Sequence, residues 1–219
     1  MNRIACFITA AVLCGSSTAS AQQAGAGASN SAVLTTSTEL SAAVDRIAAR
    51  SALWRDAMRS LSRLERHALL LTPDQVVVSE GPAAGATDAF DASTLAEVSP
   101  VLKPDGGVDV VLVVVNVDLL SSLHRRLGSS RADFEADLER VLIHEVYGHA
   151  VPYLFAGSAA GRCADPTRGE RSVDACSVRR ENAVRAQAGL GERTDYTFGG
   201  LVLMDRLSRN SALAHGTSH

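Results

Sequence analysis

The chain has 219 residues, of which 46% are hydrophobic and 21% are charged, and its formal net charge is −3. This length is enough for one well-buried core, so we expect a single domain. The slight negative charge and the scattered Lys and Arg residues exclude a broad basic surface, so nucleic acid is not an expected partner.

The first residues have the features of a secretory signal peptide. A basic residue precedes a short apolar run over residues 4–13, and small residues of the A-x-A type end at position 21. No later apolar run approaches the roughly 20 residues that a membrane span needs. We therefore expect a periplasmic or secreted protein with no membrane span. Its parts would be a signal peptide over residues 1–21, a flexible leader over 22–36 and one domain over 37–219.

Export has a consequence for the cysteines. Cleavage removes Cys6 and Cys14 and leaves Cys163 and Cys176 in an oxidising compartment. A disulfide between these two residues is therefore expected. It would close a loop of about 14 residues, worth on the order of 3 kcal/mol in the chain-entropy description.

The domain is expected to begin with a long helix. Apolar residues recur at helical spacing from residue 37 to residue 71, behind a Ser/Thr start, with Ser51 as a candidate break. His67 falls near the expected C-terminal end, where a histidine interacts favourably with the helix dipole.

Two β-branched runs, over residues 75–79 and 108–117, predict strands. The second run is almost entirely apolar, so we expect it to lie in the interior of the sheet, covered on both faces. Residues 81–107 between them are rich in Gly, Pro, Ala and Asp and predict an irregular loop, with a short turn of structure around 94–98.

Helices are expected again after the second strand. A short helix begins at Asp118, and His124 within it is expected on the surface because two arginines follow it. A capping box starting at Ser130 opens the next helix, and a polar helix is expected over residues 173–188. The predicted fold class is α+β, with a small sheet packed against the helix that begins after Ser130 and against the long N-terminal helix.

The segment VLIHEVYGHAVPYL holds two histidines and an acid inside an apolar stretch. His144 and His149 are five residues apart, which places them about 140° apart on a regular α-helix and prevents them from sharing one metal ion. One inserted residue, a π-bulge of roughly 4.4 residues per turn, returns them to one face. Gly148 tolerates unusual dihedrals and Pro152 disturbs the turn before it, so both favour such a bulge.

A catalytic zinc site needs three protein ligands and one open position. The third ligand is expected from a downstream carboxylate, and the candidates are Asp165, Glu170, Asp174 and Glu181. Asp174 and Glu181 lie seven apart on one expected helix face, so one can ligate the metal while the other orients a ligand histidine. An i,i+4 ion pair with Arg185 is the alternative role for Glu181.

Two motifs resemble those of known zinc metallopeptidases. His144-Glu145-Val146-Tyr147-Gly148-His149 is similar to the H-E-x-x-G-H motif of the dipeptidyl peptidase III family, in which both histidines bind zinc. Glu181-Asn182-Ala183-Val184-Arg185, followed by Gly189, Arg193 and Tyr196, looks like the E-N-x-x-R…G…R-x-x-Y segment of the bacterial effector-type zinc metallopeptidases. Together they cover residues 141–196, about a quarter of the chain. The resemblance implies a zincin-like domain whose zinc is bound by His144, His149 and Glu181.

The expected function is therefore zinc-dependent hydrolysis of a peptide or protein substrate. Zinc would lower the pKa of a water molecule, and Glu145 would take its proton. Tyr147 or Tyr196 could stabilise the developing oxyanion, and Arg193 could hold substrate. The alternative is a non-catalytic exported module whose zinc is structural and whose surface binds a partner.

Overall fold

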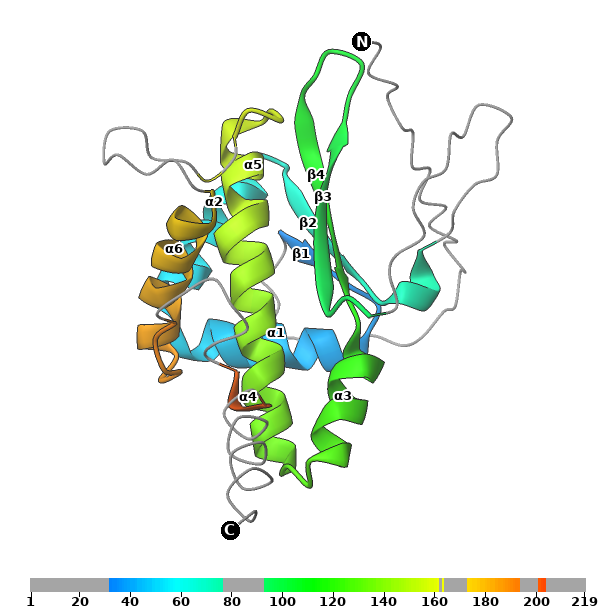
Figure 1. Cartoon of the computed structure of the whole chain (residues 1–219). Helices are drawn as coiled ribbons and strands as arrows, with labels where there is room; N and C mark the ends of the chain where they lie inside the picture. Colours follow the sequence, from blue (N-terminus) through cyan, green and yellow to red (C-terminus); the bar gives the residue numbers. More distant parts are fainter. Residues whose placement is uncertain (1–31, 77–92, 162, 164–172, 194–200, 204–219) are drawn as a thin grey trace, which may run out of the picture.

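The computed structural model describes residues 32–76, 93–161, 163, 173–193 and 201–203, with the backbone alone at positions 173 and 174. The expected signal peptide and most of the expected leader lie outside this part of the chain. The described elements combine helices with one mixed sheet, which confirms the α+β class (Figure 1). None of the described helices is long and apolar enough to cross a membrane.

Two helices, α1 (Thr38–Arg50) and α2 (Ala52–Arg63), occupy most of the region where one long helix was expected. The N–H of Ser51 donates to the carbonyl of Ile47, 2.9 Å away, and its hydroxyl accepts from the N–H of Trp54, 3.2 Å away. A serine at this position supplies an acceptor for the first turn of the new helix. Ser51 thus ends one helix and caps the next, and the candidate break is confirmed.

The sheet has the strand order β1-β2-β4-β3. Its members are β1 (Val33–Leu34), β2 (His67–Leu71), β3 (Ala96–Leu102) and β4 (Val108–Val115). β2 pairs in parallel with both β1 and β4, whereas β3 runs antiparallel to β4. β4 lies in the interior of the sheet, as its apolar run predicts, and Val111 and Val113 are fully buried.

Parts of the sheet differ from the sequence-based expectation. The segment from His67 was expected to end a helix, yet it forms β2, with Ala68 and Leu70 fully buried on one face. Buried and partly buried residues alternate along β2, which is the period of a strand. A short apolar run can form either a helix or a strand, and here its pairing with β4 selects the strand. Two strands also lie where none was expected: β3 lies within the expected loop, and β1 lies within the expected leader. Of the strand expected over 75–79, residue 75 belongs to a 3-10 turn, η1 (Pro73–Gln75), and residues 77–79 lie outside the described residues.

Two helices follow β4, namely α3 (Val117–Arg126) and α4 (Arg131–Leu142). The capping box of Ser130 and Asp133 is present at the start of α4. The expectation that His124 lies on the surface is wrong, because its side chain is 3% exposed and its Nε2 atom is 3.1 Å from Asp137 Oδ2 on α4. Packing of α3 against α4 therefore outweighs the two charged neighbours of His124 in sequence.

The helix α4 continues without a break into a π-helical segment, η2 (Ile143–Ala150), and then into α5 (Val151–Ala156). In Figure 1 this column stands between the sheet and α6 (Val173–Gln187), the expected polar helix. Segment η2 contacts β3 and β4 as well as α6. Segment η2, which carries the two histidines, is thus held between the sheet and α6.

Candidate metal centre

A π-helix accommodates the five-residue spacing of His144 and His149. Segment η2 includes both residues, and the N–H of Val151 donates to the carbonyl of Val146, five residues earlier. A π-helix has more residues per turn than an α-helix, so side chains five apart return to one face. The Nε2 atoms of the two rings are 3.2 Å apart. The predicted insertion in the helix is confirmed.

The backbone of Gly148 lies within the helical run and has no positive φ, so its conformation does not require a glycine. Its contribution is the space left by the missing side chain. A Cβ atom there would lie 3.4 Å from both the Cβ and the carbonyl oxygen of Ser177 on α6. Pro152 has no N–H to donate to the Gly148 carbonyl, four residues earlier. The Ser177 hydroxyl lies 3.4 Å from that carbonyl and donates to it. The two residues thus allow α6 to approach η2 closely.

His144, Glu145 and His149 form a group that could hold a metal ion, with ligand atoms all within 4.8 Å of one another. For a tetrahedral ion with metal–nitrogen bonds of the usual length, two ligand nitrogens lie roughly 3.3 Å apart. The observed separation of 3.2 Å between the histidine Nε2 atoms is close to this value. The chain therefore has a possible metal-binding site on η2.

Both histidines present their Nδ1 atoms to α6. His144 Nδ1 is hydrogen-bonded to Glu181 Oε2, and His149 Nδ1 is 3.3 Å from Ser177 Oγ. A carboxylate only accepts, and the hydroxyl hydrogen of Ser177 is directed to the Gly148 carbonyl, so these partners assign a proton to each Nδ1. The two Nε2 lone pairs then face each other, and a cation between them would stabilise this arrangement.

Glu181 is fully buried and has a cationic or hydrogen-bonding partner at each oxygen. Oε1 accepts from Arg185 Nη1, 2.9 Å away. Oε2 accepts from His144 and lies 3.5 Å from Arg193 Nη1, which is itself 3.3 Å from His144 Nδ1. Burial raises the pKa of Glu181, but the hydrogen bond from His144 and the nearby positive charges lower it below its usual range. The carboxylate is therefore held in its ionised form.

Asn182, the next residue of the second motif, holds the chain at Arg193. Its side-chain N–H donates to the Arg193 carbonyl, 2.7 Å away, and its Oδ1 accepts from the Arg193 N–H, 2.8 Å away. This pair of hydrogen bonds fixes the backbone that carries the guanidinium group beside Glu181. The motif residues Glu181, Asn182, Arg185 and Arg193 thus form one network next to His144.

Glu145 lies beside the two histidine nitrogens and is partly buried. Burial raises the pKa of its carboxyl group, the charge of Glu181 raises it further, and His144 lowers it. A carboxyl group with a higher proton affinity than usual suits a proton acceptor at a reaction site.

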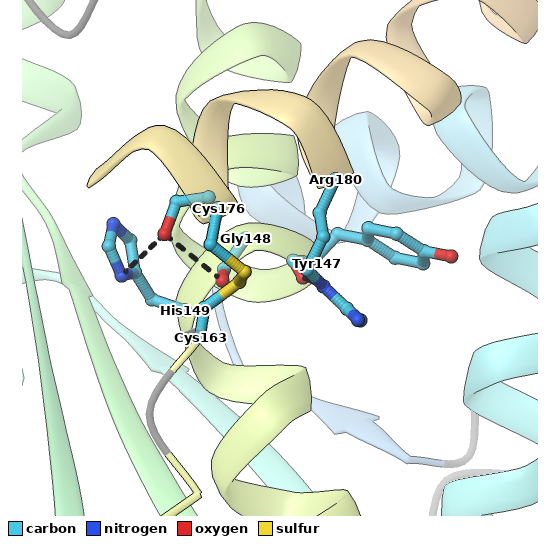
Figure 2. Close-up of a disulfide and its surroundings, with 7 residues drawn as sticks. Tyr147, Gly148, His149, Cys163, Cys176 and Arg180 are labelled. Atoms are coloured by element: carbon cyan, nitrogen blue, oxygen red, sulfur yellow. Dashed lines mark hydrogen bonds between the residues drawn. A yellow bond between two sulfur atoms is a disulfide. The ribbon is translucent and has the colours of Figure 1, made fainter. Parts of the chain in front are cut away.

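Tyr147 does not join this group. Its ring stacks on Trp54 with 6.5 Å between centroids, and the guanidinium of Arg180 lies 5.1 Å from its centroid. Figure 2 shows Tyr147 and His149 on opposite sides of the helical segment. The other candidates named from the sequence, Asp165, Glu170, Tyr196 and the side chain of Asp174, lie outside the described residues.

The expected disulfide between Cys163 and Cys176 is present, with 5.5 Å between the Cα atoms. Figure 2 shows Cys163, Cys176 and the neighbouring His149. Cys176 directly precedes Ser177, whose hydroxyl contacts His149 and Gly148. The crosslink therefore anchors α6 at the turn that meets the second histidine.

Sequence reasoning missed Ser177. A weak signal was available, since Ser177 and Glu181 are four residues apart and so lie on one face of α6. The direction in which that face points depends on the packing of α6 against η2, which the helical period does not predict.

The fold and site together define a mixed α/β protein with a possible His-Glu-His metal site on a π-helical segment. Comparisons of the chain with protein-family models, with curated proteins and with solved structures found no match.

Proposed function

We propose that this protein is a zinc-dependent peptidase in which His144 and His149 bind the metal and Glu145 acts as general base. The observation that carries the proposal is the convergence of the two Nε2 atoms, 3.2 Å apart, beside a carboxyl group of raised pKa. Neutral imidazole nitrogens next to a carboxylate are a donor set that suits zinc.

Zinc bound at this position would lower the pKa of a water molecule and polarise a substrate carbonyl group. Glu145 would accept a proton from the attacking water and later deliver it to the leaving amine. Arg193, whose guanidinium lies 3.3 Å from His144 Nδ1 and 3.5 Å from Glu181, would place a positive charge close to the bound substrate. The resemblance predicts Glu181 as the third ligand, but its contacts favour a different role, argued below. The third ligand would then come from the other downstream candidates, Asp165, Glu170 or Asp174, whose side chains lie outside the described residues.

A peptide as substrate is supported by the resemblance of both motifs to those of peptidases and by the position of β3. Within the described part of the chain, β3 pairs with β4 alone and ends the sheet. It also contacts η2, which carries the histidines. An extended peptide can add to such a sheet edge through main-chain hydrogen bonds, which would bring a peptide bond near the candidate metal site.

Action outside the cytoplasm is part of the proposal. The disulfide Cys163–Cys176 is of a kind that persists in oxidising compartments. Together with the expected signal peptide over residues 1–21, it supports a periplasmic or secreted enzyme.

The proposal is tested with the chain from residue 22 to 219, purified with zinc and offered a mixture of quenched fluorescent peptides. The variant Glu145→Gln keeps the shape of the side chain but removes the base, so we expect it to retain bound zinc and to lose at least ~100-fold in turnover. The control Glu135→Gln changes a partly exposed residue that pairs with Arg131 on α4, and we expect it to match the wild type in both measurements.

The two measurements separate the candidate functions. Full activity of Glu145→Gln would exclude Glu145 as the base. A wild-type protein that binds zinc but cleaves no peptide would favour the alternative function, a non-catalytic zinc-containing module.

A further inference from the structure

We propose that α6 positions both metal-binding histidines from their Nδ1 atoms, and that Glu181 orients His144 instead of binding the metal. This inference rests on the proposed metal site and specifies how the site is held. It assigns a positioning role to Ser177 as well, a residue that neither motif contains.

The first observation is that Glu181 and His149 contact different nitrogens of the His144 ring. His149 approaches His144 at Nε2, whereas Glu181 hydrogen-bonds to Nδ1. The two nitrogens of an imidazole ring point in different directions, and the nitrogen that does not bind a metal commonly donates to a carboxylate. Consistent with this, the metal-compatible group consists of His144, Glu145 and His149.

The second observation is that both carboxylate oxygens of Glu181 are already engaged. Arg185 binds Oε1 at 2.9 Å, and Oε2 receives the hydrogen bond of His144 beside the guanidinium of Arg193. Glu181 is 0% exposed and Arg185 is 2% exposed. Moving the carboxylate to a metal would separate a buried ion pair, which is strongly unfavourable. The network therefore keeps Glu181 at Nδ1.

The third observation is that His149 is held in the same way. Ser177 Oγ, also 0% exposed, lies 3.3 Å from His149 Nδ1 and donates its own hydrogen to the Gly148 carbonyl. Ser177 and Glu181 are one helical turn apart on α6, so a single helix face supplies an acceptor to each histidine. Both rings are thereby set in the tautomer that turns an Nε2 lone pair towards the other histidine, which is the tautomer that a metal ligand needs.

The second motif gains a physical explanation from this arrangement. Glu181 accepts from the histidine, Arg185 compensates its buried charge, and Asn182 holds the backbone that carries Arg193. Each of these residues supports the orientation of one ring.

The test compares three variants of the chain from residue 22 to 219 with the wild type, all with the disulfide intact. Zinc affinity is measured by competition with a chelator, and bound cobalt(II) is followed by its visible absorption spectrum. The amide oxygen of Gln still accepts from an imidazole N–H but is a poor zinc ligand. We therefore expect Glu181→Gln to bind one metal ion per folded chain with a cobalt spectrum like that of the wild type. Glu181→Ala and Ser177→Ala should bind the metal roughly 10- to 100-fold more weakly.

Three outcomes are distinguishable. Absence of metal from the wild type would refute the proposed metal site itself. Metal bound by the wild type but absent from folded Glu181→Gln would show that Glu181 is a ligand and would overturn the inference. Unchanged affinity in Ser177→Ala would also overturn it, and this variant removes no buried charge, so the test survives if Glu181→Ala does not fold.

Discussion

The protonation state of His149 determines the charge of the candidate site when no metal is bound. His149 is partly buried, and burial lowers its pKa from 6.5 to about 4, with a further contribution from His144. The ring is therefore neutral near pH 7 and can offer Nε2 to a cation without first losing a proton.

This shift predicts a pH-dependent stability for the metal-free protein. The folded pKa of His149 is lowered to about 4 from the 6.5 expected of an unfolded chain, so the unfolded chain binds more protons between these values. Stability present above pH 6.5 is therefore lost as the pH falls towards 4, by up to about 3 kcal/mol. Urea unfolding in the presence of a chelator at several pH values measures this change.

The control for that experiment is His149→Asn, which removes the titrating ring. Glu145 has a raised pKa and acts in the opposite direction on acidification, so the comparison of the two proteins isolates His149. Equal slopes of unfolding free energy against pH in the two proteins would contradict the prediction.

Among the elements, the close approach of η2 and α6 is the feature on which the site depends. Gly148 lies at the contact, and a Cβ atom there would just reach Ser177 at 3.4 Å. The larger, branched side chain of valine would need space that α6 now fills, and overpacking of this kind costs about 1–3 kcal/mol.

Gly148→Val is therefore expected to push α6 away from η2 and to weaken zinc binding by at least about 10-fold, because it disturbs the Nδ1 partners of both histidines. Gly191→Val is the matched control, since a Cβ at Gly191 meets nothing within 4 Å and its φ is not positive. Zinc competition and thermal unfolding of both variants give the comparison. Equal zinc affinities would show that the approach of α6 is not needed for binding.

For the molecule as a whole, a second buried network joins segments that are distant in sequence. Asp137 is 0% exposed and accepts from the N–H groups of Val202 and Leu203, at 2.8 and 3.0 Å. His124 on α3 and Arg140 on α4 each lie 3.1 Å from its oxygens. One carboxylate thus ties α3, α4 and residues 201–203 together.

Asp137→Ala is expected to lower the free energy of unfolding by about 3 kcal/mol or more, because it leaves a charged arginine and two N–H groups without their acceptor. Zinc bound per folded chain should not change, since the hydrogen bonds that Asp137 makes within the described residues go to α3, α4 and residues 201–203 and not to His144 or His149. Glu135→Ala, at a partly exposed position of the same helix, is expected to change stability by about 0.5 kcal/mol at most. A loss of stability no larger than in that control would refute the role given to Asp137.

Much of the candidate site was predictable because its signals are local. The spacing of His144 and His149, with Pro152 after them, sufficed to predict a π-helical insertion, since only that winding returns the two rings to one face. The break at Ser51 and the capping box at Ser130 follow from side chains that bond to their own helix ends. The disulfide was predicted from the two cysteines that remain once the expected signal peptide is removed.

Other features were decided only by contacts between segments distant in sequence. The run from His67 became a strand because β4 offered it a partner, and His124 became buried because α3 packs on α4. The face that α6 turns towards η2 likewise placed Ser177 and Glu181 at the Nδ1 atoms of the two histidines. The sequence alone thus determined which residues could bind a metal and how their helix must wind, because these depend on spacing along one segment. The tertiary structure decided which atoms hold those residues in place, because such contacts depend on how separate elements pack.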